Sequence, residues 1–538
     1  MSVRNAFALL LVLCSLALLV GCGSSSPTPV APPSGGFSVS DLKGTYVFST
    51  SGGDPNGEFL AMAGTLAANG SGGITGGTAD LIGLEISAPT PVAQPVTGGS
   101  YIVSADGRGQ LHFNTTTLNS LGASTGITIT LDFVLTSSSH GLVTEYDQNG
   151  VGSGTIDLQS TVSQSQLAGS YTFGLSGTGS TASYAAVGSL IMNSDGSGNV
   201  TGGVEDINNG GVYTGTGTIT AGSFVNVGTG TAPGTAVIAS TNTYTYDVYA
   251  IDSTHLKFIE TDGLLFLSGD AYTQGTSIAS GQLVYTMSGV DFAAEAPFAA
   301  GGWLTNNSGT IATGLEDYND GGNLSPIAGL TISGGFTALS GGRSQLSLTG
   351  FVNAASNDVP GNSTFAAYPF TYSGGTGIQL LEIDSAGVTS GAAYPQSSTT
   401  LAATQGYGLN LSGFNGNGEE DDIAEFVTTS SGFSGIVDLN NDMQSEGQTA
   451  QSPGQALDGS YSAPDGNGRG SGTTTNYISN FNFYVVSPTA YILLETDSGQ
   501  VAVGTFEQQA SPSGGTAQPA VSMLRPAVRP HSALRLRK

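Results

Sequence analysis

The stretch LKFIETDGLLFLSGDAYTQ, residues 256–274, ends an apolar run with a glutamate and an aspartate two positions apart. Three other segments share its pattern of Glu, any residue, Asp, a gap, Gly and then Gln: TEYDQNGVGSGTIDLQ, LEIDSAGVTSGAAYPQ and LETDSGQVAVGTFEQQ. The four glutamates, Glu145, Glu260, Glu382 and Glu495, are 115, 122 and 113 residues apart. This period exceeds the roughly 20–50 residues of propeller blades and solenoid rungs, so it indicates a repeated small domain.

Two further markers recur in the same order. Each unit opens alike, with GTYVFSTSG at Gly44, GSYTFGLSG at Gly169, GQLVYTMSG at Gly281 and QGYGLNLSG at Gln405. Between this opening and the Glu-x-Asp pair lie GGTADL, GGVEDINNGG, TGLEDYNDGG and GIVDLNND, which carry Asp80, Asp206, Asp317 and Asp438. Three markers found four times predict four tandem copies of one domain. We expect the copies to fold nearly independently of one another.

Each repeat has the pattern of a β-meander. The segment ITITLDFVL, residues 127–135, alternates apolar and polar side chains, which is typical of a half-buried strand. Short turns such as ADGRG, SSSHG and DQNGVG indicate hairpins, and about eight strands fit into each repeat. A meander of this length closes into a barrel or splits into two packed sheets.

The opening segments LKGTYVF and LAGSYTF resemble the first strand of lipocalin-type barrels, except that this chain has Tyr where that family has Trp. The resemblance favours closure. We therefore predict an all-β protein of four tandem antiparallel β-meander domains, each a small barrel, with a β-sandwich as the alternative.

The N-terminus has the form of a secretory signal. Arg4 precedes an apolar segment, residues 6–20, that is short for a membrane span and is followed by a polar, Pro-rich stretch. The tetrapeptide Leu19-Val20-Gly21-Cys22 resembles the lipobox of bacterial lipoproteins, in which the cysteine is acylated, for example with palmitate, and becomes the mature N-terminus. The alternative is an ordinary signal peptide that contains a cysteine. The resemblance implies lipid anchoring at Cys22, and Gly23 after it favours the outer membrane, facing the periplasm or the surface.

The whole chain is also similar to uncharacterised Gly/Thr-rich tandem-repeat lipoproteins of environmental bacteria, a likeness that implies no activity. The markers and the local composition set the expected parts: a signal peptide at 1–21, a Ser/Pro/Gly tether at 22–40, β-repeats at 41–160, 165–275, 280–396 and 401–510, and a basic tail without a fold at 511–538.

Charge and cysteine content exclude several functions. The net charge is −28, and all 39 acidic residues lie in the body, which makes nucleic-acid binding unfavourable. The tail holds five basic residues, Arg525, Arg529, Arg535, Arg537 and Lys538. The two cysteines, Cys14 and Cys22, both lie in the signal segment, so the body has no disulfide and no thiolate ligand for a metal.

The paired carboxylates have two interpretations. Strand parity places each glutamate on the inward, apolar face near the rim and the aspartate one step further into the turn. A glutamate there has a raised pKa, which fits a catalytic acid, but it also fits a rim residue that accepts hydrogen bonds from turn amides. Because the pair recurs in every copy, we interpret it as structural and predict no catalytic residue and no cofactor. The pairs are Glu145 with Asp147, Glu260 with Asp262, Glu382 with Asp384 and Glu495 with Asp497.

The second marker offers oxygen atoms at alternating positions, as in the first half of a calcium loop, but the distal bidentate glutamate is missing. Asp206, Asp317, Asp320 and Asp438 are therefore weak calcium candidates, and we predict no metal site. Arg108, Arg343 and Arg469 each follow a Gly-rich turn and are interpreted as surface turn residues. The single tryptophan, Trp303, is interpreted as a packing residue, with a sugar-binding platform as the alternative.

Three functions fit these observations. The first is a membrane-anchored cell-envelope lipoprotein with a structural, adhesive or interaction role and no catalysis, whose partners are the lipid bilayer, through acylated Cys22, and a surface protein or glycan. The second is a set of barrels that bind a small apolar ligand. The third is a secreted carbohydrate-active enzyme. Filled barrel interiors would argue against the second, and the third needs carboxylates that face each other across a cleft.

Overall fold

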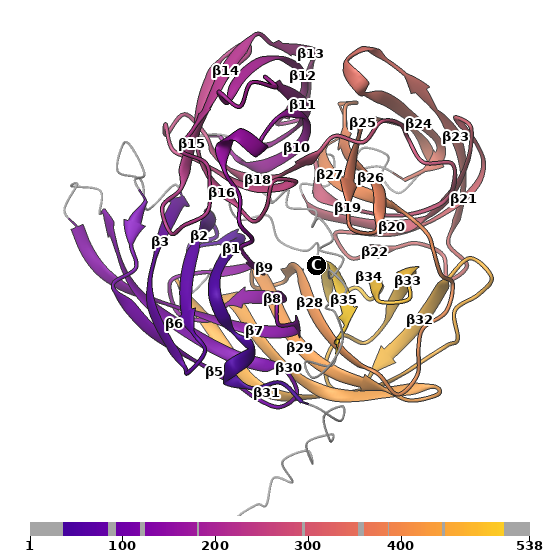
Figure 1. Cartoon of the computed structure of the whole chain (residues 1–538). Helices are drawn as coiled ribbons and strands as arrows, with labels where there is room; N and C mark the ends of the chain where they lie inside the picture. The colour runs from indigo at the N-terminus through magenta and orange to yellow at the C-terminus, as the bar shows by residue number, and fades with distance from the viewer. Residues whose placement is uncertain are drawn as a thin grey trace, which may run out of the picture. The chain divides into compact units, whose positions relative to one another are not determined.

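Each of the four repeats forms a closed, eight-stranded antiparallel barrel in the computed structural model (Figure 1). The predicted all-β fold of four tandem small barrels is confirmed, and the sandwich alternative is excluded. The structure describes residues 36–83, 93–118, 124–179, 182–292, 296–352, 360–385, 387–443 and 447–510. The predicted signal peptide, Cys22, nearly all of the tether and the basic tail lie outside these residues.

Barrel 1 consists of β1 (Lys43–Gly53), β2 (Phe59–Asn69), β3 (Gly73–Gly83), β4 (Gln94–Pro95), β5 (Gly98–Val103), β6 (Arg108–Leu118), β7 (Ser124–Ser137), β8 (His140–Glu145) and β9 (Val151–Leu158). Barrel 2 consists of β10 (Gly169–Thr178), β11 (Ser183–Met192), β12 (Asn199–Asn209), β13 (Val212–Ile219), β14 (Ala221–Val225), β15 (Gly234–Ala239), β16 (Thr243–Ala250), β17 (His255–Glu260) and β18 (Phe266–Thr273).

Barrel 3 consists of β19 (Gly281–Asp291), β20 (Ala296–Asn307), β21 (Thr310–Asp320), β22 (Asn323–Leu324), β23 (Leu330–Ala338), β24 (Ser344–Phe351), β25 (Gly361–Tyr372), β26 (Gly375–Glu382) and β27 (Gly387–Pro395). Barrel 4 consists of β28 (Gly406–Asn415), β29 (Glu419–Thr428), β30 (Gly432–Met443), β31 (Gln448–Tyr461), β32 (Arg469–Thr474), β33 (Phe481–Ser487), β34 (Ala490–Glu495) and β35 (Gln500–Gln508). Short 3₁₀ helices are η1 (Val39–Asp41), η2 (Gln164–Gln166) and η3 (Ser340–Gly342). Within the described ranges, no helix is long and apolar enough to cross a membrane.

The strands follow one another as a meander. In barrel 1, β1 pairs with β2 on one side and with the last strand, β9, on the other, and a β2–β3 pairing completes the closure. Barrels 1 to 3 each carry one extra short strand beside the third barrel strand, namely β4, β13 and β22. In barrel 4 the long strand β31 pairs with β30 along most of its length and then with β32.

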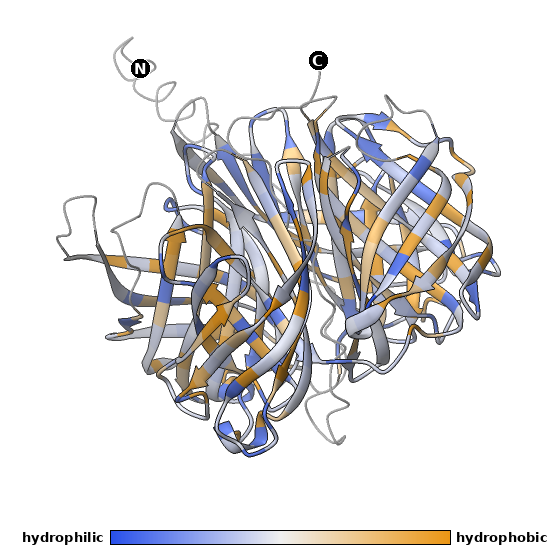
Figure 2. Cartoon of the chain, turned by 90° about the horizontal axis from the view of Figure 1, so that it is seen from above, coloured by the Kyte–Doolittle hydropathy of each residue, from blue (hydrophilic) through white to orange (hydrophobic). Residues whose placement is uncertain are grey.

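Hydrophobic residues recur along the strands of the barrels (Figure 2), and their inward side chains pack the interior, as in barrel 1. In the segment ITITLDFVL, the apolar face predicted from sequence supplies Ile129, Leu131, Phe133 and Leu135 to the core of barrel 1. Full burial of such side chains contributes about 1.5–3 kcal/mol each. The Tyr46 hydroxyl at the start of β1 donates to the Ser138 carbonyl over 2.6 Å, so this tyrosine ties the first strand to the β7–β8 turn.

The barrels also pack against one another, and these contacts form a closed cycle. Separate apolar clusters join barrel 1 to 2, barrel 2 to 3, barrel 3 to 4, and barrel 4 back to barrel 1. At the last of these contacts Gly408 of β28 lies so close to barrel 1 that an added Cβ would stand 2.8 Å from Val134 Cγ1. The expectation of nearly independent repeats does not fit these buried contacts.

Candidate functional site

An asparagine two residues beyond the marker aspartate joins one barrel to the Glu-x-Asp turn of the next. In β30, the Asn440 side-chain amide donates to the main-chain carbonyls of Glu145, over 2.7 Å, and Gly150, over 3.0 Å. Barrel 4 thereby holds barrel 1. The two motifs that define the repeat in the sequence therefore meet across a barrel–barrel contact.

The same bond pattern recurs at two other contacts. Asn208 of β12 donates to the carbonyls of Glu382, over 2.9 Å, and Gly387, over 2.8 Å. Asn319 of β21 donates to the carbonyls of Asp497, over 2.9 Å, and Gln500, over 2.7 Å. A side-chain amide that replaces water at two buried carbonyls satisfies groups that would otherwise destabilise the contact.

The marker aspartate binds a tyrosine of the next barrel. Asp80 and Asp206 accept hydrogen bonds of 2.6 Å from the hydroxyls of Tyr249 and Tyr368, and Asp317 accepts one from Tyr484. These tyrosines occupy equivalent positions in their repeats, because each lies three residues beyond the residue that pairs with the signature glutamate. Barrel 1 has Val134 at this position, so Asp438 receives no tyrosine from it.

Three of the four marker aspartates also face an arginine of the next barrel. Arg469 binds Asp317 with two hydrogen bonds of 2.6 and 2.9 Å, and Arg343 Nε lies 3.2 Å from Asp206. The Arg108 Nη1 atom lies 3.9 Å from Asp438. The interpretation of these arginines as surface turn residues is wrong for Arg343 and Arg469, whose side chains are largely buried.

The contact between barrels 1 and 2 is chemically different. Ile82 stands where the other repeats have asparagine, and no arginine reaches Asp80 within the described residues. Instead, the side-chain carboxyl groups of Asp80 and Asp247 are hydrogen-bonded to each other. Burial and the negative charge of Asp247 raise the pKa of Asp80 well above its usual range.

The signature aspartates bind backbone amides of their own barrel. Asp147 accepts from the Thr130 amide over 2.6 Å and from the Asn149 amide over 2.7 Å. Asp262 accepts from the Thr245 amide over 2.6 Å, and Asp384 accepts from the Thr364 amide over 2.9 Å. Asp497 accepts from the Asn480 amide at the equivalent position, over 3.3 Å, and from the Ser479 amide before it, over 2.7 Å. Each aspartate thus fixes the turn after its strand to the neighbouring strand or loop.

The signature glutamates are buried, with exposures of 1% or less. Burial raises the pKa of Glu260 to about 9 and moves the pKa values of Glu145, Glu382 and Glu495 well above their usual range. In repeats 2 to 4 the protonated glutamate donates to the aspartate two residues later, which raises its pKa further. In these three repeats the glutamate and the aspartate thus form one hydrogen-bonded unit at the end of a strand.

The calcium candidates are occupied by other bonds. Asp206, Asp317 and Asp438 face residues of the next barrel, and Asp320 is buried at the end of β21. Across the described ranges, no group of three or more His, Cys, Asp or Glu residues is placed to hold a metal ion. Trp303 is 8% exposed and packs in an apolar cluster that joins barrels 2, 3 and 4, so it offers no open platform.

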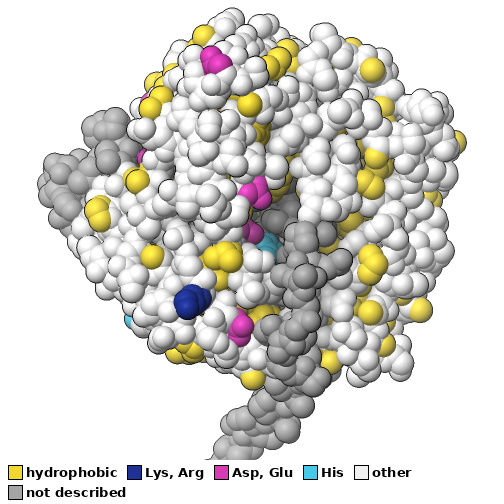
Figure 3. Space-filling model, viewed as in Figure 1, with side chains coloured by type: hydrophobic (Ala, Val, Ile, Leu, Met, Phe, Trp, Pro, Cys, Tyr) yellow, Lys and Arg dark blue, Asp and Glu magenta, His cyan; other side chains and the backbone are white. Residues whose placement is uncertain are grey.

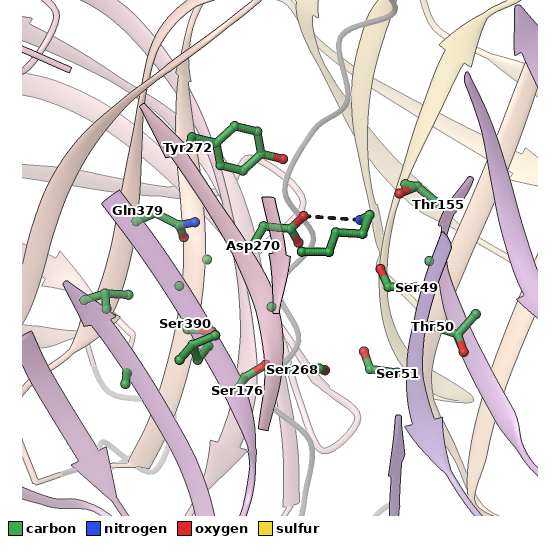
Figure 4. Close-up of a pocket in the computed structure, with 18 of the residues that line it drawn as sticks. Ser49, Thr50, Ser51, Thr155, Ser176, Ser268, Asp270, Tyr272, Gln379 and Ser390 are labelled. Atoms are coloured by element: carbon green, nitrogen blue, oxygen red, sulfur yellow. Dashed lines mark hydrogen bonds and ion pairs between the residues drawn. The ribbon is translucent and has the colours of Figure 1, made fainter. Parts of the chain in front are cut away.

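A cavity of about 450 Å³ lies where barrels 1, 2 and 3 approach one another, and Figure 3 shows histidine and acidic side chains in the hollow. Its lining includes His140, Asp157, His255, Tyr272 and Tyr372. A second, smaller cavity of about 80 Å³ shares Tyr272 and is lined mainly by small hydroxyl residues of the same three barrels (Figure 4).

The ionic groups beside these cavities are paired. His140 Nδ1 is hydrogen-bonded to Asp157 over 2.6 Å, and His140 Nε2 lies 3.1 Å from a carboxylate oxygen of Glu507 in barrel 4. Burial alone would lower the pKa of His140, but the two carboxylates outweigh it and raise the pKa to about 10. In barrel 2, Asp270 lies 2.6 Å from His255 Nε2 and 3.2 Å from Lys257 Nζ, the ion pair drawn in Figure 4.

His140 and His255 stand at matching positions, five residues before their signature glutamates, and this odd offset puts them on the outer strand face, which lines the cavity. Their partners Asp157, Asp270 and Glu507 could not be found from the local sequence, because these lie on other strands and, for Glu507, in another barrel. Scans against protein-family models and against curated proteins found no match for this chain.

Proposed function

We propose that the protein is a lipid-anchored lipoprotein of the cell envelope that acts as a preassembled, non-catalytic interaction module. Cys22 carries the acyl group, the bilayer of the outer membrane is the first partner, and residues 22–40 hold the four barrels away from it. The lipobox-like tetrapeptide and the absence of any other cysteine in the body support the anchor.

The observation that carries the non-catalytic role is the use of the repeated carboxylates. Asp206 and Asp317 bind a tyrosine and an arginine of the next barrel, and the Glu-x-Asp turns present their carbonyls to an asparagine. A catalytic acid needs access to a substrate, whereas these groups are buried and bonded within the protein. The repeated chemistry thus supports assembly of the body.

The two alternatives have less support. Barrel 4 encloses an apolar cavity of about 30 Å³, far below the roughly 300–1,000 Å³ of small-molecule sites. Glycosidases hold their two carboxyl groups about 5–10 Å apart across the scissile bond. Glu382 and Asp384 are instead hydrogen-bonded to each other at the end of one strand.

The test is metabolic labelling with a clickable fatty acid, followed by membrane fractionation, of the wild-type chain and Cys22→Ser. We expect label and membrane retention for the wild type only. Equal labelling of both, or of neither, would remove the anchor from the proposal. The purified chain is also incubated with a panel of chromogenic glycosides. If the wild type hydrolyses a glycoside and Glu382→Gln does not, the protein is an enzyme and the proposed non-catalytic role is wrong.

A further inference from the structure

The residues that line the 450 Å³ cavity break the fourfold repeat. His140 and His255 precede their signature glutamates by five positions, where repeats 3 and 4 have Gly377 and Ala490. The fold therefore forms without a histidine at this position. Their ion pairs with Asp157, Glu507 and Asp270 make the surroundings of this cavity different from the equivalent places in the other two repeats.

The volume and position of the cavity suit a small ligand. Pockets that bind small molecules measure about 300–1,000 Å³ and often lie where domains meet. Here three barrels contribute: the ends of β8 and β9, the ends of β17 and β18, and the hairpin between β25 and β26. Such a site exists only in the assembled body.

The cations beside the cavity are already paired within the protein. His140 lies beside two carboxylates and His255 beside one, as described above. The cavity therefore offers no free cation to an anionic ligand, which would be desolvated without a counter-charge. Asp252 accepts from the amides of Thr254, over 2.6 Å, and His255, over 3.0 Å, and its carboxylate can also accept hydrogen bonds from the hydroxyls of an uncharged ligand.

What the lining offers is hydroxyl groups beside aromatic rings. Ser139, Thr254 and Thr371 contribute hydroxyls. The Thr254 hydroxyl already donates to Asp252 over 2.7 Å and the Ser139 hydroxyl is hydrogen-bonded to Ser137 over 3.1 Å, so the Thr254 oxygen offers a ligand acceptor positions only. The Tyr272 ring is stacked on His255, with centroids 4.1 Å apart and planes 18° apart, and Tyr372 packs beside Tyr394 at 5.5 Å. A pyranose ring presents the complementary surface, with an apolar C–H face for a tyrosine and equatorial hydroxyls for the polar rim.

We propose that this cavity binds a neutral pyranose residue of a glycan, with Tyr372 and Thr371 in the binding surface. The inference rests on the proposed function, since it names the partner class of the interaction module. Glycan recognition at a single asymmetric site would give the four-barrel body a defined orientation toward its partner.

The test uses the full chain, purified in a detergent that contains no sugar. Methyl β-glucoside, methyl β-galactoside, methyl α-mannoside and methyl N-acetyl-β-glucosaminide are titrated by saturation-transfer NMR and calorimetry. Thr371→Trp fills the cavity from an exposed position, and Tyr372→Ala removes an aromatic wall. The matched controls are Thr349→Trp, exposed on β24 of the same barrel, and Tyr461→Ala, which lines the barrel 4 cavity instead.

We expect binding of at least one of these glycosides, a loss of about tenfold or more in Thr371→Trp and Tyr372→Ala, and unchanged binding in both controls. Absence of binding to all four sugars overturns the inference but leaves the lipid-anchored module in place, since that is tested by labelling. Loss in Tyr461→Ala but not in Thr371→Trp overturns it in favour of the barrel interior. Binding followed by hydrolysis keeps the site and overturns the non-catalytic function.

Discussion

The Asn440 side chain of the last barrel donates to the main-chain carbonyl of Glu145 in the first, over 2.7 Å and across 295 residues of sequence. Both residues are buried, and the same amide also reaches the Gly150 carbonyl. The two ends of the tandem array are therefore in direct contact, and each barrel has two neighbours.

Asn440→Ala is expected to lower the free energy of unfolding by about 1–3 kcal/mol, because it leaves two buried carbonyls without a donor. If the barrels unfold as one unit, the substitution should also lower the stability of barrel 3, although Asn440 does not contact that barrel. Trp303 is the only tryptophan and lies on β20 of barrel 3, against residues of barrels 2 and 4, so its fluorescence reports barrel 3 and its contacts with those two barrels, while far-UV circular dichroism reports all strands. Both denaturation curves should shift equally.

The matched control is Asn362→Ala, at an exposed position of β25, which should change stability by less than about 0.5 kcal/mol. A dichroism curve that splits into steps while the Trp303 curve stays in place would show that the barrels unfold separately.

Arg469→Met should be far more destabilising than Arg108→Met. Removal of Arg469 leaves Asp317 buried beside Tyr484 without its bidentate cation, and breaking such a pair costs about 3–5 kcal/mol. Arg108 is more exposed and lies 3.9 Å from Asp438, so its loss should cost about 1 kcal/mol or less. Urea denaturation at neutral pH measures both. Equal effects of the two substitutions would contradict the assigned geometry.

Glu382→Gln should leave stability at mildly acidic pH nearly unchanged and should raise it at alkaline pH. Burial raises the pKa of Glu382 well above its usual range, and a glutamine is the neutral counterpart of the protonated acid. Unfolding is measured for both chains at a series of pH values. A loss of stability that appears as the pH rises above about 4 would show that Glu382 is ionised when buried.

The wild-type chain should be most stable at mildly acidic pH. The pKa values of Asp132, Glu425 and Glu260 are raised by burial to about 7, 8 and 9. The folded state therefore holds protons that the unfolded state releases near pH 4, so stability is full below that pH and is lost as the pH rises through these values. Below about pH 4 the opposite sign applies to Asp157, whose pKa His140 lowers against the effect of burial.

Thermal melting across this pH range measures the effect, with high salt as a control for general charge repulsion. A melting temperature that rises steadily from pH 5 to 9 would contradict the assignment of protonated buried carboxyl groups.

The repeat pattern and the strand period predicted the barrels, because both depend on local alternation and on turn chemistry. Glu260 lies on the same strand face as Leu256 and Phe258 in the barrel core, as parity indicated. The contacts between barrels could not be predicted from the sequence, because the bonded residues lie in different repeats. Asp206, for example, binds Tyr368 of the next repeat. The residues around such an aspartate, which are rich in Gly and Asn, predict a turn or a calcium loop. Its actual partner in the neighbouring barrel becomes visible only in the folded structure.

The sequence did contain one usable signal for the contacts. Repeat 2 has no arginine equivalent to Arg108, Arg343 and Arg469 of the other repeats. Repeat 1 has Ile82 where the other repeats have asparagine. These two departures coincide at the contact between barrels 1 and 2, where a carboxyl pair, Asp80 and Asp247, stands instead. The asparagine of one repeat and the arginine of the next are thus missing together at the same barrel–barrel contact, which indicates that both belong to that contact.

The asparagine bridges also bear on how such a chain could originate. One surface of each barrel meets a different surface of the next, and the series returns to its start after four steps, which is the interface type of a cyclic homotetramer. Linking four identical subunits into one chain would preserve that arrangement without new contacts. It would also free each copy to vary alone, so that His140 and His255 could appear in two copies and remain absent from the others. In a tetramer of identical chains, every substitution appears in all four copies. Linking the copies into one chain therefore allows the body to have one cavity that is unlike its three counterparts.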